Sequence, residues 1–268
     1  MPFRLAVATD IHLNFVSRGE AVEFGASCSA KHGADALLIT GDIAEARDFE
    51  EALLNVDAGF HRPIYTVLGN HDYYGSTFES VHAKMAALSK RHPRISWLRT
   101  AGVVELTPTT ALVGIDGLYD CREGDGLRGA ARMTDRFRIG DFSEVHSLRV
   151  VETMIAKGEA DAARVERVLV KALRAYSEVL FATHVPPFGE LAQHKDEDVR
   201  PWYIARAMGD MLIKVAARFP KRKIHVLCGR VHAGQTIEIA PNLEATSGAA
   251  EYREPAVHTV MEIACPSS

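Results

Sequence analysis

The stretch Thr66-Val67-Leu68-Gly69-Asn70-His71-Asp72 changes abruptly in character, because an apolar run ends at a glycine and an amide, an imidazole and a carboxylate follow. Short apolar runs of this kind are typical of buried strands, and open α/β sheets bind ligands beyond the carboxyl ends of such strands. We therefore expect an α/β fold with a site at one edge of the sheet. Four other apolar runs lead into polar residues in the same way, at Asp10-Ile11-His12, Gly41-Asp42, His184 and Gly229-Arg230-Val231-His232.

The segments between these runs show helical and strand patterns. Apolar spacing predicts helices over 18–32, 48–58, 142–176 with a break at Gly158, and 201–219, and a capping-box pattern at Ser76 to Glu79 begins another. Strands are expected near 95–98, 102–106, 111–115, 234–240, 243–246 and 256–263, and their close spacing indicates antiparallel pairing. Residues 117–140 contain five glycines and five arginines and predict an irregular loop that could contribute to a substrate pocket.

Composition places the chain among ordinary globular proteins. With 268 residues and site residues that extend from Asp10 to His232, we expect a single domain over 1–268. A net charge of −4 gives no reason to expect nucleic-acid or anionic-membrane binding. The four cysteines lack metal-binding spacing, no apolar run approaches the length needed to span a bilayer, and the N-terminus leads directly into a strand. These features predict a cytoplasmic protein with reduced thiols, and an oligomer is compatible with them.

The polar residues at the strand ends are those that bind transition metals. Imidazole nitrogens and carboxylate oxygens on rigid elements suit a divalent ion. Asp10 and His12 are two apart in an extended segment, so both side chains point to the same side and could bind one ion. Asp42 could bridge two ions, and the amide oxygen of Asn70 is a neutral ligand. His184 and His232 would complete two coordination shells.

These five motifs, in this order over almost the whole chain, resemble those of the calcineurin-like metallophosphoesterase family. The resemblance implies a four-layer sandwich of two mixed β-sheets flanked by helices. It also implies a metal-dependent phosphoric ester hydrolase with two divalent ions, such as manganese, iron or zinc. The first ion would be bound by Asp10, His12, Asp42 and His232, and the second by Asp42, Asn70 and His184.

The same resemblance implies a reaction and two catalytic residues. A metal-activated hydroxide would attack phosphorus in line, as in other hydrolases with two metal ions. His71 would contact the phosphoryl oxygen or protonate the leaving group, and Asp72 would orient His71. The substrate would be a small phosphorylated molecule, either a phosphodiester or a phosphomonoester.

One position departs from the family pattern, because Arg230 stands where the first histidine of Gly-His-x-His belongs. A guanidinium cannot be a ligand, and at about 5 Å it would repel an ion by a few kcal/mol at an effective dielectric constant of about 20. Three interpretations follow: the second ion binds weakly; one ion suffices and Arg230 binds the phosphate bidentately; or the site is impaired, by natural divergence or by deliberate substitution. His194, on the same loop as His184, is a further candidate for substrate binding.

Two classes of function are therefore open. Retention of His71 and of the first ligand set favours a metallophosphoesterase. Arg230 favours the alternative, a binding or scaffold protein with the same fold and a weakened second metal site. A nucleotide-binding protein without metal is disfavoured, because no glycine-rich phosphate loop opens a helix. The sequence does not choose between phosphodiester and phosphomonoester substrates.

Overall fold

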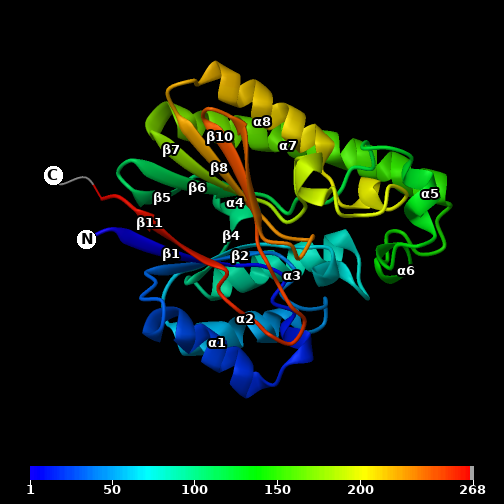
Figure 1. The fold of residues 1–268 in the computed structure, drawn as a ribbon. Helices are drawn as coiled ribbons and strands as arrows, with labels where there is room; N and C mark the ends of the chain where they lie inside the picture. The colour runs from blue at the N-terminus through cyan, green and yellow to red at the C-terminus, as the bar shows by residue number, and fades with distance from the viewer. Residues whose placement is uncertain (266–268) are drawn as a thin grey trace.

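The computed structural model describes residues 1–265 and contains two β-sheets packed face to face between helices (Figure 1). In the first sheet the strand order is β11-β1-β2-β3-β4. β1 to β4 run parallel, and β11 is antiparallel to β1. The strands are β1 (Phe3–Ala8), β2 (Ala36–Thr40), β3 (Ile64–Val67), β4 (Ile95–Trp97) and β11 (Thr259–Ile263).

The second sheet has the strand order β5-β6-β7-β8-β10-β9. Its four central strands are parallel, whereas β5 and β9 are antiparallel edges. Both sheets are therefore mixed, which confirms the predicted fold class. The strands are β5 (Val104–Thr107), β6 (Thr110–Gly114), β7 (Glu178–Ala182), β8 (Lys223–Cys228), β9 (Gln235–Ala240) and β10 (Leu243–Ser247).

Helices form the two outer layers (Figure 1). α1 (Arg18–Ala30), α2 (Phe49–Phe60) and α3 (Phe78–Arg91) cover the first sheet, and α7 (Ser147–Ala175) and α8 (Arg206–Arg218) cover the second. Short helical segments lie in the connections: η1 (Leu13–Phe15), η2 (His71–Tyr73), α4 (Leu98–Ala101), α5 (Gly126–Ala130), α6 (Asp135–Arg138), η3 (Gly189–Ala192) and η4 (Arg200–Trp202).

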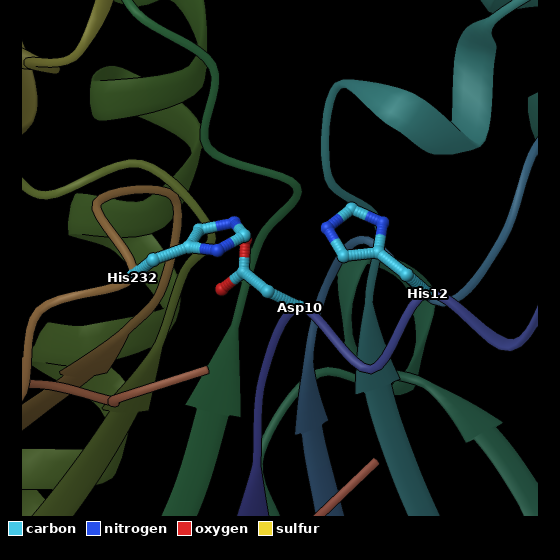
Figure 2. Close-up of side chains that lie close together, drawn as sticks. All are labelled: Asp10, His12 and His232. Carbon is cyan, nitrogen blue, oxygen red and sulfur yellow. The ribbon is translucent and has the colours of Figure 1, made fainter. Parts of the chain in front are cut away.

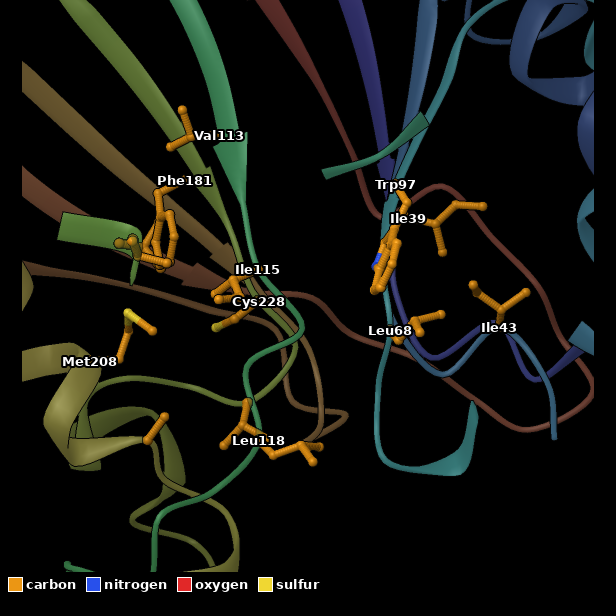
Figure 3. Close-up of a cluster of buried hydrophobic side chains, with 14 of the residues drawn as sticks. Ile39, Ile43, Leu68, Trp97, Val113, Ile115, Leu118, Phe181, Met208 and Cys228 are labelled. Atoms are coloured by element: carbon orange, nitrogen blue, oxygen red, sulfur yellow. The ribbon is translucent and has the colours of Figure 1, made fainter. Parts of the chain in front are cut away.

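Side-chain alternation along the strands builds separate core layers. In β1, Leu5 and Val7 pack between the sheets against Leu180 of β7, whereas Ala6 and Ala8 belong to the larger apolar cluster that includes the helices. Figure 3 shows part of that larger cluster, with Ile39 and Trp97 on the first sheet and Val113 and Phe181 on the second. Successive residues of a strand point to opposite faces, so strands buried on both faces are apolar throughout.

Three sequence predictions about these elements were wrong. The helix expected to break at Gly158 is continuous, because α7 passes through that residue. The glycine is explained by packing, since a Cβ there would lie 2.5 Å from the Cβ of Asp120. The strand at 95–98 does not join an antiparallel group, because β4 pairs in parallel with β3, with Ile95 opposite Ile64. The last predicted strand does not join β9 and β10, because β11 pairs antiparallel with β1 in the first sheet.

The remaining differences concern ends of elements. α3 begins at Phe78 with Thr77 as its N-cap, whose hydroxyl accepts a hydrogen bond from the Ser80 N–H, so a single cap bond at Thr77 replaces the predicted capping box of Ser76 and Glu79. The helix predicted over 201–219 begins later than expected, since η4 occupies Arg200–Trp202 and α8 begins at Arg206. The irregular segment 117–140 contains α5 and α6, which are four or five residues long.

The cysteines and the helices relate to two predictions from the sequence, namely reduced thiols and a cytoplasmic location. All four thiols are free, and those of Cys28, Cys121 and Cys228 are buried. Among the helices of residues 1–265, none combines the length and the apolar character that a bilayer span requires. A cytoplasmic location stays a prediction.

Candidate metal centre

The residues predicted to form the site lie at one edge of the molecule, where the carboxyl ends of the parallel strands of both sheets meet. The loops that carry them are joined by backbone hydrogen bonds. The Asp10 N–H donates to the Gly41 carbonyl over 3.1 Å, and the Gly229 N–H donates to the His184 carbonyl over 2.8 Å. The sheets therefore position Asp10, His12, Asp42, Asn70, His184 and His232 through short, mutually bonded loops.

The backbone at these loops adopts unusual conformations. A left-handed backbone costs a residue other than glycine on the order of 1 kcal/mol or more and is concentrated at functional sites. Gly69 allows a close approach, since a Cβ at that position would lie 2.2 Å from Oδ1 of Asp42. Four of the six predicted ligands have positive φ angles: Asp10 (48°), His12 (40°), Asp42 (51°) and His232 (59°).

The Asp10 carboxylate lies between two imidazoles, as Figure 2 shows for Asp10, His12 and His232. Nε2 of His232 lies 3.2 Å from Oδ1 of Asp10, and the ring centroids of His12 and His232 are 5.5 Å apart. Oδ2 of Asp10 accepts hydrogen bonds from the Thr9 hydroxyl (2.6 Å) and the Arg230 N–H (3.0 Å). These contacts fix the carboxylate in the orientation that faces His232.

Asp42 is the centre of a second group of imidazoles. Its carboxylate oxygens lie 3.9 Å from Nε2 of His12, 3.8 Å from Nε2 of His71 and 3.4 Å from Nε2 of His184. Burial disfavours ionisation of Asp42, but the imidazoles, His184 foremost, hold its pKa well below the usual range. The same attraction overcomes burial and raises the pKa of His184 to about 9. The attraction that favours a proton here favours a metal cation equally.

The donor atoms fit divalent metal ions. Both ring nitrogens of His12 are buried and have no hydrogen-bond partner within residues 1–265, which is costly unless an ion is bound. Burial lowers the pKa of His12 to about 4, so its imidazole is neutral, as a ligand must be. Ligand atoms converge within 4.8 Å in three sets: Asp10, His12 and His232; His12, Asp42 and His71; and Asp10, Asp42 and His184.

Asn70 is fully buried, and its amide is held in one orientation. Its Oδ1 lies 3.0 Å from Nε2 of His184, on the side that faces Asp42, and its Nδ2 donates to Oδ1 of Asp135 over 2.9 Å. The Tyr74 hydroxyl also donates to Oδ1 of Asp135. Asp135 therefore directs the amide oxygen of Asn70 toward the position expected for a ligand.

Arg230 is buried beside this amide, and its charge is paired. Its Nη2 donates to Oδ2 of Asp135 over 2.9 Å and to the Trp202 carbonyl over 3.3 Å, and its guanidinium lies over the Tyr203 ring at 4.4 Å. Burial opposes the charge, but Asp135 more than compensates, so the pKa of Arg230 is raised. The repulsion expected from the sequence assumed an unpaired guanidinium, but Asp135 places a negative charge 2.9 Å from it.

Asp135 was missed by sequence reasoning. It lies in α6, within the irregular segment 117–140, where several acidic residues follow no periodic pattern. The one available signal was Arg230 itself, because a buried arginine requires a carboxylate partner. That signal indicates that a partner exists but not which residue it is.

Asp72 does not orient His71, contrary to the prediction. Its Oδ1 accepts hydrogen bonds from the N–H groups of Ile43 and Ala44, and its Oδ2 accepts one from the Gly69 N–H. These bonds connect the loop after β2 to the loop after β3. Asp72 thus braces the loops that carry Asp42 and Asn70.

His71 is instead positioned by other groups. Its N–H donates to Oδ1 of Asp42 over 2.9 Å, and its ring stacks on Tyr74 with centroids 4.3 Å apart. The ring is partly exposed and lines a cavity of about 560 Å³ together with Asp42, Arg230 and His232. A side chain that is both fixed and accessible is suited to contact a substrate.

The cavity has two further features. Tyr252 lines it and stacks on His12, with ring centroids 4.4 Å apart and an interplanar angle of 22°. His194, a predicted substrate-binding residue, is exposed and does not line the cavity, whereas its neighbour Lys195 does. The loop turns so that position 195 faces the cavity and position 194 faces solvent.

The fold and this cluster of carboxylate, imidazole and amide groups define a metal-binding α/β sandwich protein. The family model of the calcineurin-like phosphoesterases matches residues 3–213. The chain therefore belongs to the calcineurin-like phosphoesterase family, and its general function is that of a metal-dependent phosphoesterase. Arg230 and His232 lie beyond the matched segment.

Solved structures share the fold of this chain. The phosphopantetheinyl hydrolase PptH of Mycobacterium tuberculosis superposes with a TM-score of 0.70 at 13% identity, covering 98% of this chain and 96% of that one. A dimetal phosphatase from Danio rerio gives a TM-score of 0.59 at 14% identity, with 93% and 88% covered. At these identities the likeness is one of fold. No functionally curated protein matches the chain in sequence.

Proposed function

We propose that the protein is a phosphoesterase that hydrolyses a small phosphodiester or phosphomonoester in the cavity above Asp42. The observation that carries this proposal is the convergence of His12, His71 and His184 on the Asp42 carboxylate, within 3.9 Å. The two ligand sets implied by the family motifs both include Asp42, which would then bridge two ions. We infer manganese, iron or zinc from the mixture of nitrogen and oxygen donors.

Bound divalent ions would lower the pKa of a water molecule and stabilise the charge that develops on the phosphoryl group. The protein's own groups would provide position and a proton. Asp42 holds the backbone of His71, and Tyr74 stacks on its ring, so its imidazole is directed into the cavity. There the ring would contact a phosphoryl oxygen or donate a proton to the oxygen of the leaving group.

The paired charge of Arg230 supports an active enzyme over a scaffold. An unpaired guanidinium beside the second ligand set would oppose a cation there, but Asp135 supplies the compensating charge. Asp42, Asn70 and His184 remain as three ligands for a second ion. A scaffold protein would have no reason to keep His71 fixed and accessible, or the nitrogens of His12 buried without a hydrogen-bond partner among residues 1–265.

The proposal is tested by activity and metal content measured together. Metal-depleted protein is titrated with manganese, iron and zinc against matched aryl phosphomonoester and aryl phosphodiester substrates. We expect turnover that rises with bound metal, and about a thousandfold loss in Asp42→Asn, because loss of a bridging ligand disrupts both ions.

The control is Asp210→Asn, which removes an exposed carboxylate on α8 and should leave turnover unchanged. The proposal would be contradicted if the Arg230→His variant hydrolysed a substrate and no metal-loaded form of the wild type did. That result would favour the alternative of a binding or scaffold protein with an impaired site.

A further inference from the structure

A lysine on the wall of the cavity has no partner for its charge. Lys195 is half-buried, and within residues 1–265 its Nζ makes no hydrogen bond or ion pair with a carboxylate. It lies over the Tyr203 ring, 4.8 Å from the centroid. Lysine ammonium groups are strongly hydrated, and they usually extend into water or pair with an acid when they are partly buried.

The other two cations of the cavity are neutralised by the protein. Arg230 pairs with Asp135 over 2.9 Å, and Arg132 pairs with Asp196 over 3.2 Å. Among the lysines and arginines that line the cavity, Lys195 is thus the one that forms no ion pair in the described part of the chain. Arg230 and Lys195 also share one aromatic ring, because both lie within 5 Å of the Tyr203 centroid.

The position of Lys195 is unfavourable for its charge in the protein alone. Burial lowers the pKa of Lys195, the nearby charge of Arg230 lowers it further, and a weaker attraction to Asp10 does not offset them. The Tyr203 ring attracts the ammonium through a cation–π interaction, which restrains it without neutralising it. An anion entering the cavity would provide the missing charge.

The scissile phosphoryl group would not occupy this position. That group belongs beside Asp42 and His71, and within residues 1–265 no hydrogen bond or ion pair joins either of them to Lys195, whose ammonium lies over Tyr203 instead. A cavity of about 560 Å³ is large enough for more than a phosphate, since small-molecule sites commonly measure about 300–1,000 Å³. An anion at Lys195 would therefore be a second charged group of the substrate.

We propose that Lys195, held over Tyr203 beside the Asp135–Arg230 pair, forms a subsite for a second anionic group of the substrate, either a carboxylate or a phosphate. This inference rests on the proposed function. It narrows the substrate of the proposed enzyme to phosphoesters whose organic group carries a second anion. A lysine is a point charge on a flexible stem, so it suits both kinds of anion.

The test is direct binding of phosphonates, which cannot be hydrolysed. The purified metal-loaded protein is titrated calorimetrically with propylphosphonate and with 3-phosphonopropionate, in which a carboxylate replaces the terminal methyl group. 4-Phosphonobutyrate and 5-phosphonopentanoate vary the distance between the two anions. We expect the best carboxylated ligand to bind about tenfold more tightly than the alkylphosphonate, which corresponds to about 1.4 kcal/mol.

Variants assign that gain to Lys195. Lys195→Met keeps the apolar stem and should abolish the gain, whereas Lys195→Arg should retain it. Lys214→Met removes an exposed lysine of α8 and should leave the gain unchanged. Thermal melts check that all variants are folded. The proposal is overturned if carboxylated ligands show no gain at any spacer length, or if the gain persists in Lys195→Met.

Binding and turnover separate this inference from the proposed function. A gain that depends on Lys195 in a protein that hydrolyses no ester would support the subsite and contradict the proposed enzyme. Turnover without such a gain would support the enzyme and overturn the subsite.

Discussion

The two halves of the candidate metal centre balance their charge in different ways. On one side, Asp10, His12, Asp42 and His232 present carboxylates and imidazoles to one another, and in residues 1–265 no lysine or arginine side chain pairs with Asp10 or Asp42. On the other side, Asn70 is held by Asp135, and Asp135 is paired with Arg230. The carboxylates of the first half face only imidazoles, which a metal ion could bind, whereas the Asp135–Arg230 pair of the second half is already neutral within the protein.

This difference changes the meaning of the Arg230 substitution. Considered alone, an arginine in place of a histidine ligand removes one donor and adds a repulsive charge. Together with Asp135 it removes the donor but adds little net charge. The second ion would then be weakened mainly by the lost ligand, and Asn70 would still be directed toward it. Three predictions test this comparison.

The largest effect is expected from Asp135→Asn, which leaves Arg230 buried without an anion. Breaking a buried ion pair by removing one partner costs about 3–5 kcal/mol. We expect a loss of that size in the free energy of unfolding, measured with urea. Asp210→Asn is the matched control, because Asp210 forms an exposed pair with Arg206 over 2.9 Å and such pairs contribute at most about 1 kcal/mol.

A double variant separates the pair from the fold around it. Asp135→Asn combined with Arg230→Met removes both charges and should recover most of the lost stability, since apolar replacement of a buried pair is often neutral. If Asp135→Asn costs no more than Asp210→Asn, the second half of the site does not depend on this pair, and the comparison fails.

A smaller effect is expected in Arg230→His, which restores an imidazole at the position of the missing ligand. The new nitrogen adds a donor, and Asp135 stays as an unpaired anion nearby. We expect the second metal ion to bind at least about tenfold more tightly, or about 1.4 kcal/mol. Chelator competition and metal analysis of the purified proteins measure this change.

The matched control places a new histidine away from the site. Arg206→His on α8 should leave metal binding unchanged, because Arg206 is exposed and pairs with Asp210 and Glu123. Equal metal stoichiometry and affinity in Arg230→His and the wild type would show that Arg230 does not limit the second ion.

The two halves also differ in how far the sequence predicted them. Ligands that follow apolar runs were recognisable because a strand end and a polar residue are adjacent in the chain, and the structure brings Asp10, His12, Asp42 and His232 together. Asp135 and Lys195 were not recognised, because they come from connections whose course depends on tertiary packing. His194 was proposed because it lies on the loop after His184, but the loop conformation turns its neighbour Lys195 to the cavity instead.

The fold was predicted in class but not in all its pairings. Mixed sheets and flanking helices followed from the family resemblance. The parallel position of β4 did not, because three short strands in succession suggest a meander. Gly158 was interpreted as a helix break, but the structure explains this glycine by its close contact with Asp120. Asp120 is 38 residues away in the sequence, so the local pattern could not show that contact. Local patterns cannot reveal contacts between distant segments.

The smallest effect is expected for Tyr252, a half-exposed residue that contacts His12 of the first half. Because it stacks on His12 and lines the cavity, its ring offers an aromatic surface to the substrate. We expect Tyr252→Leu to raise KM for an aryl phosphodiester about twofold with kcat unchanged, since an aromatic pair contributes about 0.5–1.5 kcal/mol. Steady-state kinetics on the metal-loaded enzyme measure both constants.

The two kinetic constants decide what Tyr252 does for the first half. Phe137→Leu replaces an aromatic ring that is 66% exposed and outside the cavity, so it should change neither constant. A fall in kcat with KM unchanged in Tyr252→Leu would mean that the ring positions His12 rather than the substrate. The first half of the site would then depend on an aromatic neighbour for its geometry, as the second half depends on Asp135.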